Sequence, residues 1–283
     1  MGINTASTPS RPASAREEGP GHSGRYLRSH GGLLLRVTRG ELSARYAGSF
    51  LGLGWVGLAP LFIIGIYAIV YLYIFRQATA ATGLAPFEYL LYIVAGLVPY
   101  LVTAEALSLG VGSVVANKSV LSSVVFPIDL IPPRAVLMSQ GTMAVGVVVL
   151  VLGSAATGHL HWTIVLAPIV WVMQVAALIG VVWILSLLHI VFRDLVNLIN
   201  VLLMMLLIAS PIVYTTAMVP AKMKLILALN PLAYYIVVYQ EIFVLGQLPT
   251  LLQSVLLVGF SVGSFLGGGW FFARAKSVLI DYV

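Results

Sequence analysis

The sequence contains no cysteine, and it contains few charged residues. The missing cysteine excludes disulfides, thiolate catalysis and cysteine-ligated metals. Asp, Glu, Lys and Arg make up only 8% of the 283 residues, whereas soluble proteins carry about 25%. Hydrophobic residues make up 60%. This composition is typical of a polytopic membrane protein.

Charged residues are absent from the whole stretch between Arg134 and Arg193, which is 58 residues long. A transmembrane helix needs about 20 apolar residues. The stretch is therefore expected to hold two membrane crossings, with a hinge at Gly158–Trp162 between them. Because a soluble domain could not bury so long an apolar run, we infer a membrane domain.

Uncharged stretches of similar length recur along the chain. A further apolar piece, Leu225–Leu245, is interrupted by Asn230-Pro231, and neither half is long enough to cross. We interpret it as two half-helices that enter the membrane from outside and return. The expected fold class is an all-α polytopic membrane protein with six transmembrane helices, an N-terminal interfacial helix and an outer re-entrant helical hairpin. The six spans are Leu51–Phe75, Tyr89–Val115, Ala135–Ala156, Ile164–Val191, Leu195–Tyr214 and Leu251–Phe272.

The N-terminal part differs in composition from the spans. Residues 1–30 are rich in Ser, Pro, Gly and Arg and have no apolar core, which indicates a disordered cytoplasmic tail rather than a signal peptide. Residues 31–50 mix leucines with arginines, a pattern typical of an amphipathic helix at a membrane surface. Residues 51–283 are expected to form one transmembrane domain.

Basic residues are unequally distributed between the two sides that six spans define. With both termini in the cytoplasm, twelve of the fifteen Lys and Arg residues are cytoplasmic, and only Arg76, Lys222 and Lys224 are outside. This asymmetry satisfies the positive-inside rule, and a full crossing by Leu225–Leu245 would weaken it. The net charge of +6 is therefore explained by membrane topology, and we expect no nucleic-acid partner.

Motifs for nucleotide binding and catalysis are missing. No G-x-x-x-x-G-K-[ST] occurs, so the chain lacks that phosphate-binding loop. Gly52–Gly57 matches G-x-G-x-x-G, but it opens a membrane span and follows no strand, so its glycines are assigned to packing. His159 and His161 have no carboxylate near them in the sequence and are interpreted as hairpin residues rather than metal ligands. We expect a chain that is not an enzyme and holds no cofactor or metal.

Some residues inside the spans allow two interpretations. Tyr92 and Tyr100 share a helical face that would suit either an interface belt or stacking on sugars. Glu105 would serve either as a proton or substrate relay or as a satisfied contact between helices, and the lack of an intramembrane basic partner favours the contact. On the last span, one helical face consists of glycines and has no side chains. This face would pack against another helix either within one protomer or between two protomers. It is formed by Gly259, Gly263 and Gly267.

The segment Asn117–Pro127 is expected to form a short amphipathic helix that ends at a proline. Asp129 and the rigid pair Pro132-Pro133 follow it and lead into the third span. Fixed ends of this kind suit an element that receives movement from another protein.

Six groups of residues stand out in order along the chain. They are Arg45-Tyr46 with Leu51-Gly52, Trp55 and Pro60; Gly96–Tyr100 with Glu105-Ala106; Asn117-Lys118 with Phe126-Pro127 and Pro132; Phe192–Asp194; Ser210–Tyr214; and Asn230-Pro231. Together they resemble the membrane subunits of bacterial ABC-2 type polysaccharide exporters, which include O-antigen, capsule, teichoic acid and galactan permeases. The resemblance covers residues 36–283.

The resemblance implies a permease subunit of an ATP-driven ABC exporter that moves a lipid-linked polysaccharide across the bacterial inner membrane. It implies a complex of two permease subunits, the second being another copy of this chain, with two ATP-binding cassette subunits. ATP and Mg²⁺ would then be held by the partner subunit, in agreement with the missing phosphate loop. Membrane lipids would surround the permease.

Four sets of site residues follow from these expectations. Substrate-channel residues are Tyr67, Tyr71, Tyr92 and Tyr100. ATPase-coupling residues are Arg36, Arg39, Arg45, Asn117, Lys118, Phe126, Pro127 and Asp129. Outer-gate residues are Tyr214, Asn230, Pro231 and Glu241. Cations for an anionic diphosphate lipid at the cytoplasmic substrate mouth are Arg28, Lys118 and Arg134.

Two other transporter classes stay open. One is an ABC-2 permease for a drug or small lipid, which would share the fold. The other is an ion-coupled secondary transporter, which would normally need several intramembrane ionisable residues, whereas Glu105 is nearly alone.

Overall fold

The computed structural model describes residues 22–70, 83–117, 128–158, 160–215, 218–220 and 224–279. In these ranges the chain forms helices joined by short loops, without strands. Five helical segments are long and apolar enough to cross a membrane, which supports the expected all-α polytopic class. They are Gly52–Ile69, Pro86–Val111, Ile128–Ala156, Trp162–Val191 and Leu251–Lys276.

The expected fifth span is represented by a shorter helix. α10 (Leu195–Ala209) has 15 residues. At about 1.5 Å per residue such a helix is about 22 Å long, less than the roughly 30 Å of a bilayer core. It stops because Ser210 takes an extended conformation just before Pro211. The number of six crossings therefore stays a prediction.

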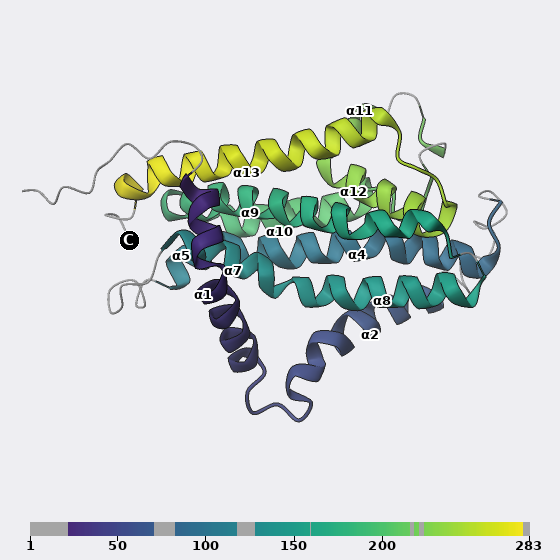
Figure 1. Cartoon of the computed structure of the whole chain (residues 1–283), viewed down its shortest axis with the longest axis horizontal. Coiled ribbons are helices and arrows are strands. Elements are labelled where there is room, and N and C mark those ends of the chain that lie inside the picture. Colours follow the sequence, from purple (N-terminus) through teal and green to yellow (C-terminus); the bar gives the residue numbers. More distant parts are fainter. Residues whose placement is uncertain are drawn as a thin grey trace, which may run out of the picture.

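Helix α1 (His22–Arg45) lies across one end of the bundle and runs transverse to the long helices (Figure 1). It begins within the expected tail of residues 1–30 and ends before residue 50. Leu34 and Thr38 are buried, while Arg36 and Arg39 are exposed. One face of this helix is therefore buried and another is exposed, while its placement at a membrane surface stays a prediction. We call this end of the bundle the α1 end.

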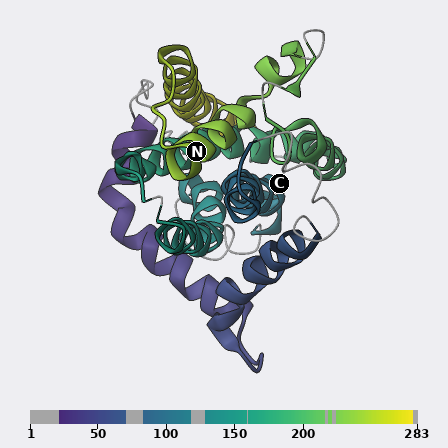
Figure 2. The same cartoon turned by 90° about the vertical axis from the view of Figure 1, so that its right-hand side faces the viewer.

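Helix α4 (Pro86–Val111) is the central helix of the bundle, as the end-on view in Figure 2 shows. Pro86 suits the first helical position, and the Glu88 carboxylate accepts the backbone N–H of Ala85 at 3.0 Å. Most of its residues are buried. The helices packed around it are α2 (Trp55–Ile69), α7 (Ile131–Met138), α8 (Gln140–Ala156), α9 (Ala167–Val191), α10 and α12 (Pro231–Gln240).

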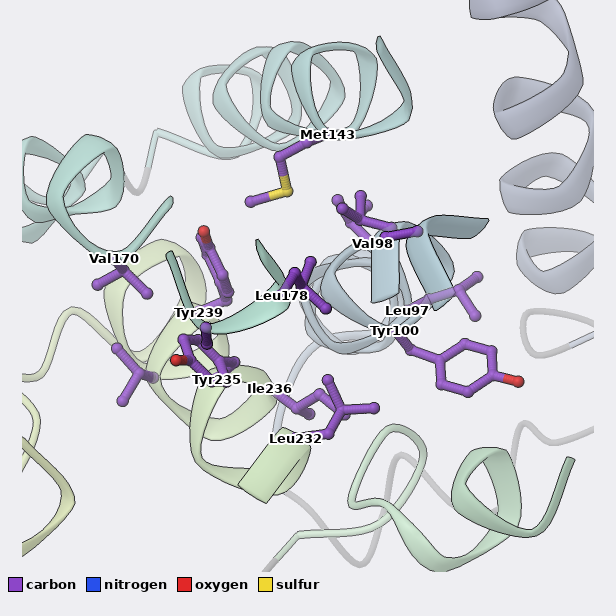
Figure 3. Close-up of a cluster of buried hydrophobic side chains, with 14 of the residues drawn as sticks. Leu97, Val98, Tyr100, Met143, Val170, Leu178, Leu232, Tyr235, Ile236 and Tyr239 are labelled. Atoms are coloured by element: carbon purple, nitrogen blue, oxygen red, sulfur yellow. The ribbon is translucent and has the colours of Figure 1, made fainter. Parts of the chain in front are cut away.

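The core contains side chains from helices α2 to α13 that are far apart in the sequence. Figure 3 shows Leu97 and Val98 of α4 near Met143 of α8, Leu178 of α9 and Tyr239 of α12. These residues are buried. Because α4 is surrounded by other helices, its sequence needs no polar face toward water.

The last helix, α13 (Leu251–Leu279), packs mainly on α9. The two backbones meet at Gly180 and Gly268, where a β-carbon on either glycine would overlap backbone atoms of the other helix. Close to this crossing, Trp183 lies between two phenylalanines, with ring centroids 5.5 Å from Phe265 and 6.2 Å from Phe272. The expected packing face contacts no helix in the described part of the chain, since an added β-carbon would meet nothing within 4 Å at Gly259, Gly263 or Gly267.

The end opposite α1, which we call the α12 end, contains the expected helix break. α11 (Lys224–Leu229) stops before Asn230, and α12 begins at Pro231. α12 continues into one turn of π-helix, Glu241–Leu245, that closes at Gly246 with a positive φ of 64°. The break is thus present, while re-entry of this piece into a membrane stays a prediction.

The remaining connections are short. The expected hinge follows α8, where Gly158 has a φ of 73°, and is succeeded by the 3-10 turn Trp162–Leu166. Similar turns, Gly52–Gly54 and Ile128–Leu130, precede α2 and α7, and α5 (Ser113–Ala116) follows α4.

Candidate functional site

Five polar side chains from distant parts of the sequence meet at the α1 end. We call this set the charged junction, and its members are Glu41, Arg45, Glu105, Asn117 and Arg134. Arg134 of α7 pairs through Nε with Glu41 of α1 at 2.5 Å, and its Nη2 donates to Asn117 Oδ1 at 3.0 Å. One guanidinium therefore connects the helix across the bundle end with the residue that follows α5.

Glu105 forms the other half of the junction. Its Oε2 accepts the Thr142 hydroxyl of α8 at 2.7 Å, and its Oε1 lies 3.6 Å from Nη1 of Arg45. These contacts confirm that Glu105 joins helices, the interpretation favoured from the sequence. Its basic partner was missed because Arg45 comes from α1, outside the uncharged spans.

A pocket of about 370 Å³ lies beside the junction. α1, α4, α5 and α7 all contribute to its wall. Its wall contains the acidic residue Glu41 as well as the basic residues Arg45 and Arg134. The pocket is therefore not a purely basic binding site for an anion. Its lining residues are Glu41, Ala44, Arg45, Leu109, Ser113, Ala116, Asn117, Arg134, Ala135 and Met138.

Asp129 is fixed on the other side of segment 118–127. Its two carboxylate oxygens accept Lys276 Nζ of α13 at 3.0 and 3.2 Å, and its backbone carbonyl accepts the Trp183 indole N–H at 3.1 Å. Asn117 and Asp129, two of the predicted coupling residues, are therefore both held by charged partners. The sequence analysis missed Lys276, which is 147 positions away.

The predicted channel tyrosines fall into two places. Tyr67 of α2 packs against the core cluster that contains Tyr100 of α4, and the Tyr100 hydroxyl donates to the Leu203 carbonyl of α10 at 3.0 Å. In Figure 3 the Tyr100 ring points away from Tyr235 and Tyr239. Tyr92 lies separately, at the α12 end, and both Tyr92 and Tyr100 are buried in the protomer, at 4% and 7% exposure.

The α12 end brings together two motifs that are far apart in the sequence. Asn230 caps α12 by accepting the Leu232 N–H at 3.0 Å, and its amide donates to the Ser210 hydroxyl at 2.8 Å. Gln240, which the sequence analysis missed, donates from Nε2 to the Pro211 carbonyl at 2.8 Å. The sequence did offer one signal for Gln240, which is an amide side chain in an apolar stretch. A buried amide needs hydrogen-bond partners, so such a residue is expected to contact other elements. Pro231 occupies the first helical position, as expected after a cap.

The π-helical turn is joined to two other elements. The Ser154 hydroxyl of α8 donates to the Phe243 carbonyl at 3.0 Å, and the Thr163 hydroxyl donates to the Ile242 carbonyl at 2.7 Å. Glu241 accepts Gln253 Nε2 of α13 at 3.0 Å. Tyr214, another predicted gate residue, donates to the Ala209 carbonyl at 2.6 Å. The four predicted gate residues therefore lie just after the end of α10 and at the two ends of α12.

Other predicted site residues lie outside the described part of the chain. They are Tyr71, Lys118, Phe126 and Pro127, together with the side chain of Arg28. Within the described ranges, no group of three or more His, Asp or Glu residues is placed to hold a metal ion.

Known proteins resemble this chain over most of its length. An O-antigen export system permease protein RfbA from Myxococcus xanthus is 29% identical over 241 residues, 84% of this chain and 90% of that protein. Two proteins of the same name from Klebsiella pneumoniae are each 31% identical. The first match covers 76% of this chain and 82% of the Klebsiella protein. The second match covers 80% of this chain and 85% of the Klebsiella protein. No protein-family model matches the sequence.

The chain belongs to the O-antigen export permease family. This confirms the resemblance drawn from the six motif groups. The permease is a multi-pass membrane protein, as its five long apolar helices indicate. Its charged junction and its α12-end cluster lie at opposite ends of the bundle (Figure 1).

Proposed function

We propose that this chain is the membrane subunit of an ATP-driven exporter that carries a lipid-linked polysaccharide across the bacterial inner membrane. The observation that supports this most is the similarity to O-antigen export permeases, which extends over 82% and 85% of the two relatives with 31% identity. A permease for a drug or small lipid would share the fold, but the three relatives reported above are all named O-antigen export permeases. An ion-coupled mechanism is disfavoured because Glu105 is already engaged by Thr142 and Arg45.

The energy source is proposed to lie on a separate ATP-binding cassette subunit, which would hold ATP and Mg²⁺. The chain lacks a phosphate-binding loop, so an ATPase site of that type has to come from elsewhere. The proposed contact is segment 118–127, with Phe126 and Pro127, together with Arg36, Arg39 and Arg45 of α1. Arg36 and Arg39 are exposed on α1 and would be accessible to such a partner.

The complete exporter is proposed to contain two copies of this chain and two ATPase subunits. Tyr67, Tyr71, Tyr92 and Tyr100 are proposed to line the substrate path. Because Tyr92 and Tyr100 are buried in the protomer, this role would require the helices around them to separate during transport. Arg28, Lys118 and Arg134 remain the proposed cations of the cytoplasmic mouth, although Arg134 already pairs with Glu41.

Removing the partner ATPase should abolish both ATP hydrolysis and export. We expect the purified permease alone to show no hydrolysis, and the permease co-expressed with its ATP-binding subunit to co-purify and hydrolyse ATP. The measurements are complex yield, phosphate release and polysaccharide at the cell surface. A partner with its phosphate-loop lysine replaced is the control, and it should assemble without hydrolysis. Hydrolysis by the isolated permease, or failure to bind any ATP-binding subunit from the same genome, would contradict the proposal.

The proposed orientation places both termini in the cytoplasm. The chain has no native cysteine, so a single cysteine reports one position without background. In spheroplasts, Ser277→Cys should resist a membrane-impermeant thiol reagent applied from outside, whereas Gln247→Cys at the exposed turn after the π-helix should react. The reverse labelling pattern would show that the orientation is wrong.

A further inference from the structure

The pocket beside the charged junction has the size and lining of a ligand site. Its volume of about 370 Å³ is within the range of pockets that hold small ligands. Glu41 and Arg45 of α1 and Arg134 of α7 supply its charged groups. The other described lining residues are mostly small or apolar, so a bound molecule would meet charge at only a few points.

The charges around this pocket balance one another. Arg134 pairs with Glu41, and Arg45 lies 3.6 Å from Glu105. The Arg134 side chain is only 11% exposed, so an unbalanced charge placed here would be poorly solvated. An added anion or cation would create such an imbalance, whereas a molecule that carries both signs would not. The pocket therefore favours a zwitterionic ligand.

Arg45 can bind the negative group of such a ligand. Its Nη1 is 3.6 Å from Glu105 Oε1, which is too long for a hydrogen bond, and its side chain is 40% exposed. The Tyr46 ring also orients it, since the guanidinium carbon lies 5.8 Å from the ring centroid. A guanidinium held in this way suits two oxygens of one phosphate group.

Glu41 can accept the positive group. Its Oε2 pairs with Nε of Arg134, and its side chain is 38% exposed. A carboxylate has about four acceptor positions, so Glu41 can also accept N–H groups from a ligand. A primary ammonium offers such groups. A quaternary ammonium has none and is usually bound by aromatic rings, and the described lining residues include no aromatic residue.

The chain next to the pocket is apolar on its exposed surface. Phe50 is fully exposed, and Leu51 and Leu53 are 43% and 51% exposed. They lie in the connection between α1 and α2, a few residues after Arg45. In a membrane protein, exposed apolar side chains at such a connection are expected to contact acyl chains. A ligand of this pocket would therefore have lipid tails beside it.

We propose that the pocket binds the headgroup of a resident phospholipid that carries a phosphate diester and a primary ammonium group, as phosphatidylethanolamine does. The Arg45 guanidinium holds the phosphate, and the Glu41 carboxylate accepts the ammonium. The acyl chains lie along the exposed apolar residues that follow α1. This lipid stays with the permease and is separate from the exported one, so its binding is independent of the proposed function.

Lipid retention by the purified full-length permease tests the site. The protein in detergent is mixed with equal amounts of phosphatidylethanolamine, phosphatidylcholine and phosphatidylglycerol that have the same acyl chains. Size-exclusion chromatography then removes free lipid, and mass spectrometry measures what stays bound. We expect about fivefold more phosphatidylethanolamine than either other lipid, because only its headgroup supplies a charge-assisted N–H bond without unbalancing the charge. Glycerophosphoethanolamine, the same headgroup without acyl chains, should compete weakly.

Glu41→Gln keeps the size of the side chain and removes its charge, so it should retain the three lipids equally. Asp194→Asn is the matched control, because Asp194 is an exposed acid just before α10 and does not line the pocket. It should keep the wild-type preference. Ala44→Leu covers the case in which Glu41→Gln does not fold. It keeps every charge and fills the pocket from an exposed position of α1, so it should retain several-fold less phosphatidylethanolamine with an unchanged unfolding midpoint in detergent alone.

Several results would overturn the inference. They are equal retention of the three lipids by the wild type, a preference for phosphatidylglycerol, and full competition by glycerophosphoethanolamine. Wild-type retention in a folded Glu41→Gln or Ala44→Leu variant, or a lost preference in Asp194→Asn, would also place the lipid elsewhere. Failure of the complex to export polysaccharide in cells would contradict the proposed function and leave these lipid measurements unchanged.

Discussion

Gly180→Ala should strongly destabilise the folded permease. Gly180 lies where α9 crosses α13, and an added β-carbon would overlap the carbonyl oxygen of Ser264. The obstacle is backbone rather than the end of a flexible side chain, so one helix has to move away from the other. We expect a loss of about 3 kcal/mol in the free energy of unfolding, because overpacking costs this much when the surroundings cannot relax. The yield of monodisperse protein in detergent and its thermal unfolding midpoint measure the effect.

Two further alanine variants give this prediction a matched comparison. Gly268→Ala should be as damaging, since its β-carbon would overlap the Gly180 carbonyl oxygen. Gly267→Ala, one position earlier on the same helix, should be nearly neutral, because nothing lies within 4 Å of the added carbon. Equal stability of the Gly267 and Gly268 variants would show that close approach of α9 and α13 is not required.

Gln240→Met should loosen the α12 end of the bundle. The Gln240 amide is 1% exposed and donates to the Pro211 carbonyl at 2.8 Å, with the Ile212 and Tyr92 carbonyls at 3.4 Å. Methionine has a similar size and no donor, so it keeps the packing but leaves buried carbonyls unsatisfied. We expect the free energy of unfolding to fall by about 2 kcal/mol, the usual cost of an unmade buried hydrogen bond.

The same variant should also impair export, because Gln240 connects α12 with the segment that follows α10. Gln247→Met is its control, since this glutamine is exposed just beyond the π-helical turn. Amide hydrogen exchange should rise in residues 210–214 of the Gln240 variant and stay unchanged in the Gln247 variant. Identical exchange in both variants would mean that the amide does not tie these elements together.

Several features could be predicted because they depend on local sequence. The absence of charge from residues 135–192 indicated two crossings, and α8 and α9 are found there, separated at Gly158. Asn230-Pro231 predicted a helix break, because proline favours the first helical position and asparagine caps it, and both residues have these roles. The ordered motifs indicated the permease family, which the relatives confirm.

Packing partners could not be predicted in the same way. Periodicity marked Gly259, Gly263 and Gly267 as a bare helical face, but the glycine that meets α9 is Gly268. The reason is that the rotation of α13 about its own axis depends on its neighbours, among them Trp183 of α9, whose ring contacts Phe265 and Phe272 of α13. In a chain this apolar, hydrophobic patterning does not distinguish a lipid-facing surface from a protein-facing one.

The sequence by itself determined that this is a helical membrane protein of the permease family, where most of its helices lie and that it lacks the phosphate-binding loop of ATPases. Those properties follow from composition, uncharged length and proline position, which act over a few turns of chain. Only the tertiary structure decided which charges pair. Glu105 meets Arg45, Arg134 meets Glu41 and Asp129 meets Lys276 across 60 to 147 positions of sequence. An ion pair depends on distance in space, and that distance exists only after α1 has packed against α7 and α13 has packed against α9.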